Sequence, residues 1–336
     1  MVRKAFRGIF REQIALPRTM FICISLNPAI DKRLVVSSLV SGQVHRARAV
    51  ESFPGGKATH VAMVLRTLGE APQWIGLCGG STGAELVSGL SALDILVHPV
   101  KTHQPTRTNL EIIEDNEAVT EILEPGCAPS VAELSDFETT CENLFPQKGE
   151  AVSVIFCGSL PAGAPSDLYA RLIRRARENR CRTFLDTSGE PLRQALPARP
   201  HFVKPNREEA TGVLGVTIDS LTAAVDAVRS LIRLGAHSAA LSLGAQGLLF
   251  CPAENAPVLF APPPRLSPRS SVGCGDSALA GIAHAISHGA TPEDTLRLGA
   301  ACAAANCLAD SPGAARLEGI RRFQNEIRLQ TLETGS

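Results

Sequence analysis

The sequence lacks an excess of charge, a long apolar run and most aromatic side chains. Its 336 residues include 33 Lys and Arg against 33 Asp and Glu, and only 4% are aromatic. A balanced charge offers no basic surface for nucleic acid, so we expect no nucleic-acid partner. No apolar run reaches the roughly 18 residues that a membrane span needs, and we expect no membrane association.

Paired cysteine motifs are also missing. The chain has ten cysteines, but they are scattered and form no C-x-x-C pair. This spacing is not typical of a zinc site or a disulfide framework. Several cysteines lie inside apolar runs such as VSVIFCGSL, where cysteine behaves as a small hydrophobic residue. We therefore expect free thiols and a reducing, cytoplasmic location.

The first 19 residues are rich in arginine but contain no apolar core of a signal peptide. Their composition is compatible with a transit peptide, with a disordered tail, or with a start codon placed too early. Met20 directly precedes the first strand-like run, FICISL, which favours the last two. We expect an N-terminal extension at 1–19 and one domain at 20–336.

Apolar strand-like runs alternate with helical patterns along the chain. FICISL and AVSVIFCGSL read as buried strands, and DLYARLIRRARENR reads as an amphipathic helix. This alternation predicts an α/β fold with a doubly wound, mainly parallel sheet and helices on both faces. Ligands of such sheets bind beyond the carboxyl ends of the strands. We expect the polar turns of FCGSL, LDTSG, VKPN and LSLG to gather there.

Two segments interrupt the alternation. DKRLVVSSLVSGQVHRARAVESF and RTNLEIIEDNEAVTEILEPG read as β-hairpins without helices between their strands. They predict a small β-sheet lid formed by about 32–53 and 97–124. Short exposed strands often pair with a second copy, so we expect a homodimer through the lid.

The stretch SSVGCGDSALAGI carries the main chemical signal. Two glycines, Gly273 and Gly275, precede Asp276 at the start of an apolar helix. An aspartate there can simply complement the helix dipole. Alternatively, the glycines expose backbone N–H groups to an anion and Asp276 acts beside it. The stretch alone is compatible with both interpretations.

Neither standard nucleotide motif is present: the chain has no G-x-x-x-x-G-K-[ST] and no G-x-G-x-x-G after its first strand. It nevertheless resembles the PfkB family of carbohydrate kinases, and within it 1-phosphofructokinases and tagatose-6-phosphate kinases. The matching stretches occur in the family's order: SLNPAIDK, GGKATHVAMVLRTLG, TRTNLEI, GSLPAGAP, LDTSGEPL, VKPNREE, LSLGAQG and SVGCGDSALAG.

The resemblance implies transfer of the γ-phosphoryl group of ATP to a sugar hydroxyl, a reaction that needs positioning, a base and Mg²⁺. It assigns Asp276 as the catalytic base, with Gly273 and Gly275 presenting N–H groups to the phosphoryl oxygens. It places Ser242, Gly244, Gly247 and Cys274 on the nucleotide side. Asn206 and Glu209 match residues that organise Mg²⁺ and its waters, although N-x-x-E is also a helix-capping pattern.

On the sugar side the resemblance implies contacts from Asp31, Gly55, Gly56 and Ser159. Arg107, Lys57 and Arg46 are candidate phosphate ligands, Arg107 foremost because a guanidinium binds phosphate bidentately; Lys57 and Arg46 are equally compatible with solvated surface charges.

One departure concerns GGKATH, where Ala58 and His60 replace the glycine and asparagine usual in the family. That asparagine typically bonds the sugar, so we expect His60 at the sugar and an altered sugar preference.

The resulting expectation is an ATP- and Mg²⁺-dependent kinase of a ketohexose phosphate: fructose 1-phosphate, fructose 6-phosphate or tagatose 6-phosphate. Two alternatives remain at this point. One is a degenerate kinase fold that binds a sugar phosphate as a regulator. The other is a kinase of an unphosphorylated sugar.

Overall fold

The computed structural model describes residues 19–145 and 151–332, so residues 1–18 of the expected N-terminal extension lie outside the described residues. The strands are β1 (Met20–Ser25), β2 (Ala29–Val35), β3 (Ala49–Gly55), β4 (Gln73–Cys78), β5 (Leu96–Lys101), β6 (Arg107–Ile113), β7 (Val119–Leu123), β8 (Val152–Cys157), β9 (Arg182–Asp186), β10 (Phe202–Val203), β11 (Ser238–Ser242), β12 (Leu248–Cys251), β13 (Val258–Ala261) and β14 (Gln330–Leu332). The helices are α1 (Lys57–Thr67), α2 (Gly80–Ala92), α3 (Val131–Leu144), α4 (Leu168–Glu178), α5 (Gly189–Ala195), α6 (Arg207–Leu214), α7 (Leu221–Arg233), α8 (Cys274–Ser287), α9 (Pro292–Cys307) and α10 (Leu317–Glu326), with 3₁₀ turns η1 (Leu196–Ala198) and η2 (Gly244–Gln246).

The large sheet has the order β14-β13-β12-β11-β10-β9-β8-β1-β4-β5. From β11 to β5 all neighbouring strands are parallel, whereas β12, β13 and β14 extend one edge by antiparallel pairing. Strands β4 and β5, which follow β1 in the chain, lie on one side of it in the sheet, and the later strand β8 lies on its other side. The order of the strands therefore reverses at β1. The expectation of a doubly wound, mainly parallel α/β sheet is confirmed.

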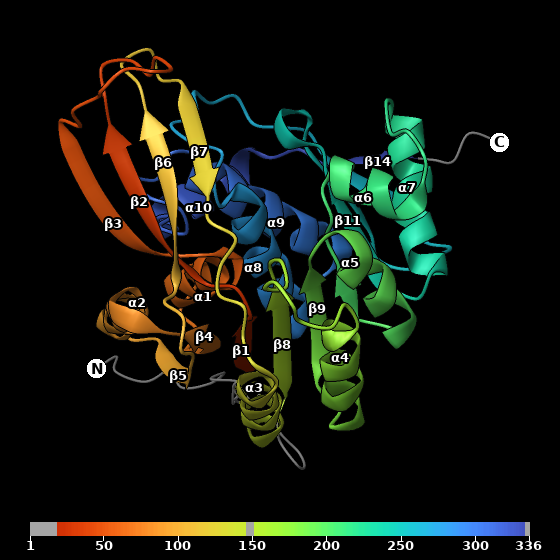
Figure 1. Cartoon of the computed structure of the whole chain (residues 1–336). Coiled ribbons are helices and arrows are strands. Elements are labelled where there is room, and N and C mark those ends of the chain that lie inside the picture. Colours follow the sequence, from red (N-terminus) through yellow and green to blue (C-terminus); the bar gives the residue numbers. More distant parts are fainter. Residues whose placement is uncertain (1–18, 146–150, 333–336) are drawn as a thin grey trace, which may run out of the picture.

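Helices cover both faces of this sheet, each over its own apolar core (Figure 1). In β1, Ile22 and Ile24 face one core, and Phe21 and Cys23 face the other. The first core also contains buried residues of α3 to α7, and the second contains those of α1, α2, α8, α9 and α10. Burial on both faces explains why the strands read as continuous apolar runs rather than as an alternating pattern.

Local sequence signals account for several helix ends. Ser130 and Glu133 form a reciprocal capping box at the start of α3, as their spacing predicts. Thr291 accepts a hydrogen bond from the backbone N–H of Asp294, and Pro292 occupies the first position of α9, where its missing N–H costs nothing. Helix α1 begins at Lys57, directly after Gly56, which has a φ of 91°.

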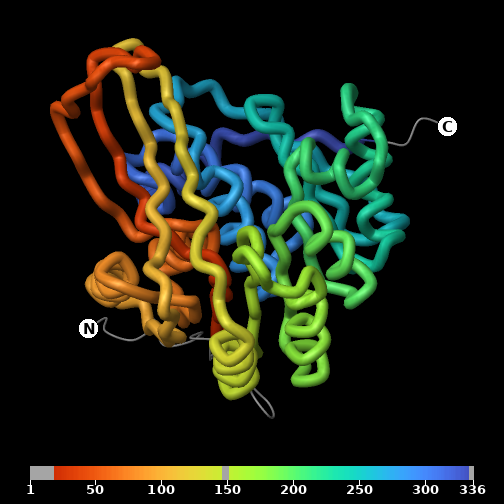
Figure 2. Tube along the Cα trace, viewed as in Figure 1, coloured from red at the N-terminus to blue at the C-terminus, as the bar shows by residue number. Residues whose placement is uncertain are grey.

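A second, four-stranded sheet has the order β3-β2-β6-β7. Figure 2 shows these strands side by side above the large sheet, although β2 and β6 are far apart in the chain. Ser270 donates a hydrogen bond to Glu111 of β6 at 3.0 Å, which ties the small sheet to the segment before α8. A separate small sheet therefore exists as expected, but residues 97–101 of the second expected lid segment belong to β5 of the large sheet instead. Their parallel pairing to β4 explains this difference.

Within the described part of the chain, no helix combines the length and the apolar character needed to cross a membrane. All ten cysteines are free thiols.

Candidate active site

A cavity of about 530 Å³ lies where the parallel strands of the large sheet end, with the small sheet along its other side. Residues at or just after successive strand ends line it: Asn27 after β1, Ser159 after β8, Asp186 at the end of β9, Lys204 after β10 and Ser242 at the end of β11. Asn109 of β6 and Glu121 of β7 line it from the small sheet. The polar turns therefore gather at one rim, as the fold rule predicts.

The amino end of α8 faces this cavity. Gly273 precedes the helix with a φ of 75°, a left-handed conformation that favours glycine. A Cβ there would also lie 3.0 Å from Cβ of Pro312. Asp276 lies in the first turn and its side chain is 9% exposed. This geometry directs the first N–H groups of the helix and one carboxylate into the same cavity.

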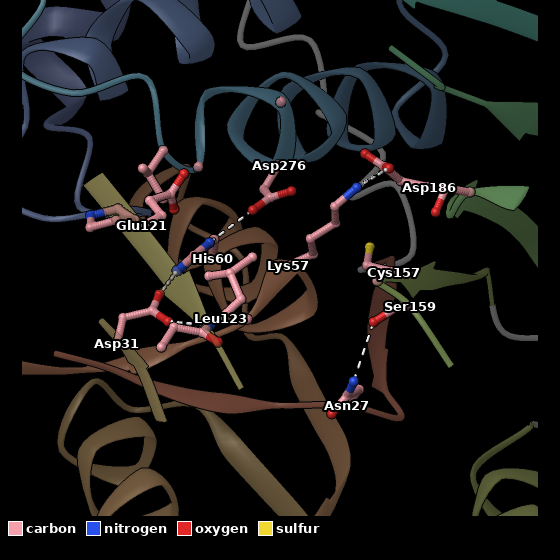
Figure 3. A pocket seen from close by; sticks show the side chains of 18 of the residues that line it. Asn27, Asp31, Lys57, His60, Glu121, Leu123, Cys157, Ser159, Asp186 and Asp276 are labelled. Atoms are coloured by element: carbon pink, nitrogen blue, oxygen red, sulfur yellow. Dashed lines mark hydrogen bonds and ion pairs between the residues drawn. The ribbon is translucent and has the colours of Figure 1, made fainter. Parts of the chain in front are cut away.

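His60 of α1 connects two carboxylates of the cavity (Figure 3). Its Nδ1 lies 2.8 Å from Oδ2 of Asp276, and its Nε2 lies 3.0 Å from Oδ2 of Asp31. The side chain is 5% exposed. Both ring nitrogens are engaged, so neither is left to bind a sugar hydroxyl directly. The expectation that His60 itself contacts the sugar is not supported by this geometry.

The two carboxylates determine the charge of His60. Burial alone would lower its pKa, but the hydrogen bonds and charges of Asp276 and Asp31 outweigh it and raise the pKa to about 10. At neutral pH the ring is therefore a cation that donates both N–H groups. For Asp31, burial raises the pKa, but the hydrogen bonds from His60 and from Asn109, the latter at 2.9 Å, leave the pKa below its usual value.

A second charged network lies on the other side of Asp276. Nζ of Lys57 is 2.8 Å from Oδ1 of Asp186 and 3.3 Å from Oε1 of Glu209, and Nζ of Lys204 is 2.7 Å from Oδ2 of Asp186. Burial would raise the pKa of Asp186, but the two ammonium groups lower it to about 2. For Lys57, burial lowers the pKa, and the carboxylates of Asp186 and Glu209 more than reverse this. The network places two cations beside the amino end of α8.

Arg107 begins β6 and lines the cavity from the small sheet. Its Nη1 donates to the backbone carbonyl of Glu124 at 2.9 Å, whereas its buried Nε has no hydrogen-bond partner among the described residues. A buried donor without a partner costs free energy. Arg107 therefore brings an unused donor to the wall of the cavity.

The N-x-x-E pair forms a capping box. Oδ1 of Asn206 accepts the N–H of Glu209 at 2.7 Å, and Oε2 of Glu209 accepts the N–H of Asn206 at 2.8 Å. Both residues also line the cavity, so the structural role and a role at the ligand are compatible. Nearby, Asn27 donates to Oγ of Ser159 at 3.2 Å.

Several residues singled out in the sequence do not line the cavity. Gly55 supports it indirectly, because a Cβ there would come within 2.3 Å of Cγ of Asp31. Gly244 is the first residue of η2 and Gly247 follows its last residue, two and five positions after the cavity residue Ser242. Arg46 is exposed on the small sheet's connecting segment. Their functional roles stay predictions.

Cys274 points away from the cavity. Its Sγ lies 2.9 Å from Sγ of Cys307 and 3.4 Å from Nδ2 of Asn306, both in α9. The hydrogen bond with Cys307 and burial raise the pKa of Cys274, whereas the same hydrogen bond lowers the pKa of Cys307. The position beside helix N–H groups therefore does not make Cys274 an activated thiol, and its backbone rather than its side chain borders the glycine loop.

Several polar residues of the cavity are not singled out by the sequence patterns, among them Asn27, Asn109, Asp186 and Lys204. Each of these four lies in a stretch that carries the family resemblance, in SLNPAIDK, TRTNLEI, LDTSG or VKPN. For Asp186 the sequence does contain a signal, since it is a charged residue at the end of an apolar strand-like run. Its two lysine partners are distant in sequence, so their convergence is visible in the fold alone.

The pfkB family carbohydrate kinase model matches residues 20–317. The chain is 36% identical over 308 residues to a 1-phosphofructokinase of Xanthomonas campestris pv. campestris, a match covering 89% of this chain and 95% of the relative. It is 35% identical over 279 residues to a 1-phosphofructokinase of Rhodobacter capsulatus, covering 83% and 87%. A D-tagatose-1-phosphate kinase of Klebsiella oxytoca is 30% identical over 318 residues, covering 93% and 100%.

Solved structures agree with these matches. The phosphofructokinase-2 of Escherichia coli, solved in complex with substrates and products, superposes with a TM-score of 0.84 at 26% identity, covering 92% of this chain and 99% of that one. The matched range extends from β1 into α10 and includes every cavity residue named above. This chain belongs to the pfkB family of carbohydrate kinases.

Proposed function

We propose that this kinase transfers the γ-phosphoryl group of ATP to a hydroxyl of a ketohexose phosphate. The observation that carries the proposal is Asp276, held by His60 in the first turn of α8 and facing a cavity that also contains Arg107. A base, an anion-binding helix end and a separate guanidinium are the three groups that phosphorylation of an already phosphorylated sugar requires.

In the proposed reaction the sugar hydroxyl lies against Asp276. The hydroxyl oxygen attacks the γ-phosphorus, its proton passes to the Asp276 carboxylate, and ADP leaves with the electrons of the broken P–O bond. Oδ2 of Asp276 accepts the His60 N–H, which leaves Oδ1 for the hydroxyl proton. The N–H groups after Gly273 and the cation of Lys57 stabilise negative charge that develops on the phosphoryl oxygens.

The substrate's own phosphate is assigned to Arg107, whose buried Nε has no partner within residues 19–145 and 151–332. Asp31, Asn109 and Ser159 are placed to bond sugar hydroxyls. The relatives at 35–36% identity carry the name 1-phosphofructokinase, and the K. oxytoca relative is named for tagatose 1-phosphate. These names favour a ketohexose 1-phosphate, fructose 1-phosphate first. A complex of the E. coli enzyme with fructose 6-phosphate keeps that isomer as the second candidate.

ATP is assigned to the side of the cavity formed by Ser242, Asn206 and Gly275, next to η2. Mg²⁺ fits the oxygen donors of Asn206 and Glu209, since a hard cation prefers oxygen ligands and keeps several waters. Both oxygens of Glu209 already accept hydrogen bonds, which favours contact through water rather than direct ligation. Mg²⁺ would neutralise charge on the ATP phosphates.

A homodimer through the small sheet is part of the proposal. Alternation along the strands places Leu34, Val50, Ile112 and Ile122 on the face opposite the cavity residues Asp31 and Glu121. Val50 and Ile122 are 53% and 52% exposed, an apolar surface that a second copy would cover. A solved E. coli relative is described as a tetrameric inhibited form. Light scattering on the native protein and on I122K tests this contact.

The activity is tested by measuring ADP release with MgATP and a panel of sugars and sugar phosphates. We expect turnover with fructose 1-phosphate, less with fructose 6-phosphate or tagatose 6-phosphate, and none with unphosphorylated fructose. Turnover of fructose equal to that of its phosphates would contradict the assignment of Arg107. Absence of turnover, with saturable binding of a ketohexose phosphate, would establish a binding protein in place of a kinase.

A further inference from the structure

Three potential metal ligands meet at the edge of the molecule where α8 ends. Glu70 follows α1, and His284 and His288 lie one helical turn apart at the carboxyl end of α8. Oε1 of Glu70 lies 3.0 Å from Nδ1 of His284 and 2.7 Å from Nε2 of His288. Two imidazole nitrogens therefore converge on one carboxylate oxygen.

The rings are held by packing rather than left loose at the surface. The His284 and His288 centroids are 4.6 Å apart, and Phe21 of β1 lies 6.5 Å from the first and 6.3 Å from the second. The side chains of Glu70, His284 and His288 are 14%, 23% and 36% exposed. The cluster is thus ordered on the protein side and open to solvent on the other.

Nδ1 of His284 is the ring nitrogen that faces Glu70. This nitrogen is buried, so an ion placed between it and the carboxylate of Glu70 would be enclosed on the protein side.

We propose that Glu70, His284 and His288 form a binding site for a divalent transition metal ion, Zn²⁺ or a similar borderline cation. This site is separate from the catalytic cavity. The donor set of two imidazoles and one carboxylate suits such ions, whereas Mg²⁺ prefers oxygen alone. The negative end of the α8 dipole adds to the attraction for a cation.

The three donor atoms can bind one zinc ion after moving slightly apart. Zinc bonds imidazole nitrogen and carboxylate oxygen at about 2.0–2.2 Å in tetrahedral geometry, which puts neighbouring donors about 3.3 Å apart. The two N···O separations of 2.7 and 3.0 Å are slightly shorter, and the three donor atoms all lie within 4.8 Å of one another. A water molecule would occupy the fourth position on the open side.

The proposed site lies where helices α1 and α8 both end. Helices α1 and α8 pack against each other and both begin at the catalytic cavity, where they carry His60 and Asp276. Both end at the cluster, α8 with His284 and His288, and α1 with the turn that contains Glu70. A bound ion would join these two helices at the end remote from the chemistry. Binding is therefore expected to raise the thermal unfolding midpoint.

The test is calorimetric titration of the chelator-treated full chain with Zn²⁺, without nucleotide or sugar, alongside H288A and E70Q. We expect one saturable site in the native protein and affinity at least about ten-fold weaker in each variant, since even outer-shell changes at metal sites cost roughly 10–100-fold. The matched control is H103A, because His103 also pairs with a glutamate, Glu133, at 2.9 Å but is 96% exposed. Its affinity should equal that of the native protein.

Co²⁺ provides a second readout that does not depend on activity or stability. Its visible absorption should intensify on binding to the native protein and to H103A, and remain that of the aqueous ion with H288A. Identical titrations of the native protein, E70Q and H288A would place any bound zinc elsewhere, for instance on the adjacent thiols of Cys274 and Cys307, and would overturn the proposal. Absence of saturable binding to the native protein would overturn it as well.

Discussion

Nδ1 of His60 lies 2.8 Å from Oδ2 of Asp276, although the two residues are 216 positions apart in the chain. The same ring reaches Asp31 through Nε2 at 3.0 Å. One buried imidazolium thus positions the proposed base and a proposed sugar ligand together. His60 lies in GGKATH, at the position where the family resemblance implies an asparagine.

The first prediction concerns this positioning role. Replacing His60 by alanine removes a charge-assisted hydrogen bond to Asp276 that is worth about 1.5–3 kcal/mol. We expect kcat to fall roughly 10- to 100-fold, with little change in KM for ATP. Steady-state kinetics with saturating sugar phosphate measures both constants.

H60N provides the discriminating comparison. Asparagine has one amide group with a shorter reach, so it can bond one carboxylate but not bridge both. We expect partial recovery of kcat relative to H60A. Equal kcat in all three proteins would mean that His60 has no part in orienting the base.

The second prediction concerns Asp276 itself. D276N keeps the size and the helix-start position of the side chain but cannot accept the proton. Loss of a general base typically lowers turnover by ~10²–10⁴-fold, and we expect MgATP binding to be retained. D310N, which alters a carboxylate that is 67% exposed, is the control. Near-native turnover of D276N would remove Asp276 from the proton transfer.

The third prediction concerns the substrate phosphate. R107Q should raise KM for the sugar phosphate roughly 10- to 100-fold, because a hydrogen bond to a charged group is worth about 1.5–3 kcal/mol. KM for ATP should stay within a factor of about two. R46Q changes an exposed arginine that does not line the cavity and should behave like the native enzyme. A parallel rise of both Michaelis constants would argue for a general disturbance of the fold rather than phosphate binding.

The fold and part of the site follow from local sequence patterns. The apolar strands, the polar turns after them and the capping boxes at Ser130 and Asn206 each depend on residues close together in the chain. The connection of His60 to Asp276, and of Asp186 to Lys204, depends on how separate strands and helices converge. The sequence shows the types of these side chains but not which of them meet, so His60 was expected at the sugar and Lys204 was not singled out.

The fourth prediction follows from the charge of His60. Its pKa is about 10 in the folded protein and about 6.5 in an unfolded chain. The raised value stabilises the fold fully below pH 6.5, and this contribution is lost as the pH rises to 10. The difference in unfolding free energy between the native protein and H60N should therefore shrink by about 1 kcal/mol per pH unit between pH 7 and 10. Urea unfolding at several pH values measures it, and a constant difference would mean that the ring is neutral.

The last prediction concerns the pair of Asp186 and Lys204, whose side chains are 1% and 3% exposed. D186N removes the negative charge and leaves Lys204 buried beside Lys57 without an anionic partner at that position. Breaking a buried ion pair in this way typically costs about 3–5 kcal/mol, and we expect a loss of that size in urea unfolding. D94N is the matched control, because Asp94 pairs with Arg66 at 3.1 Å but is 80% exposed, and such pairs contribute about 0–1 kcal/mol.

A second variant, K204M, removes the charge of Lys204 but keeps a side chain of similar length. It deletes the cation but keeps Lys57 as a partner of Asp186 at 2.8 Å, so it should destabilise less than D186N. If D186N lost no more stability than D94N, water entering the cavity would have to solvate both lysines, and the network would serve the ligand rather than the fold.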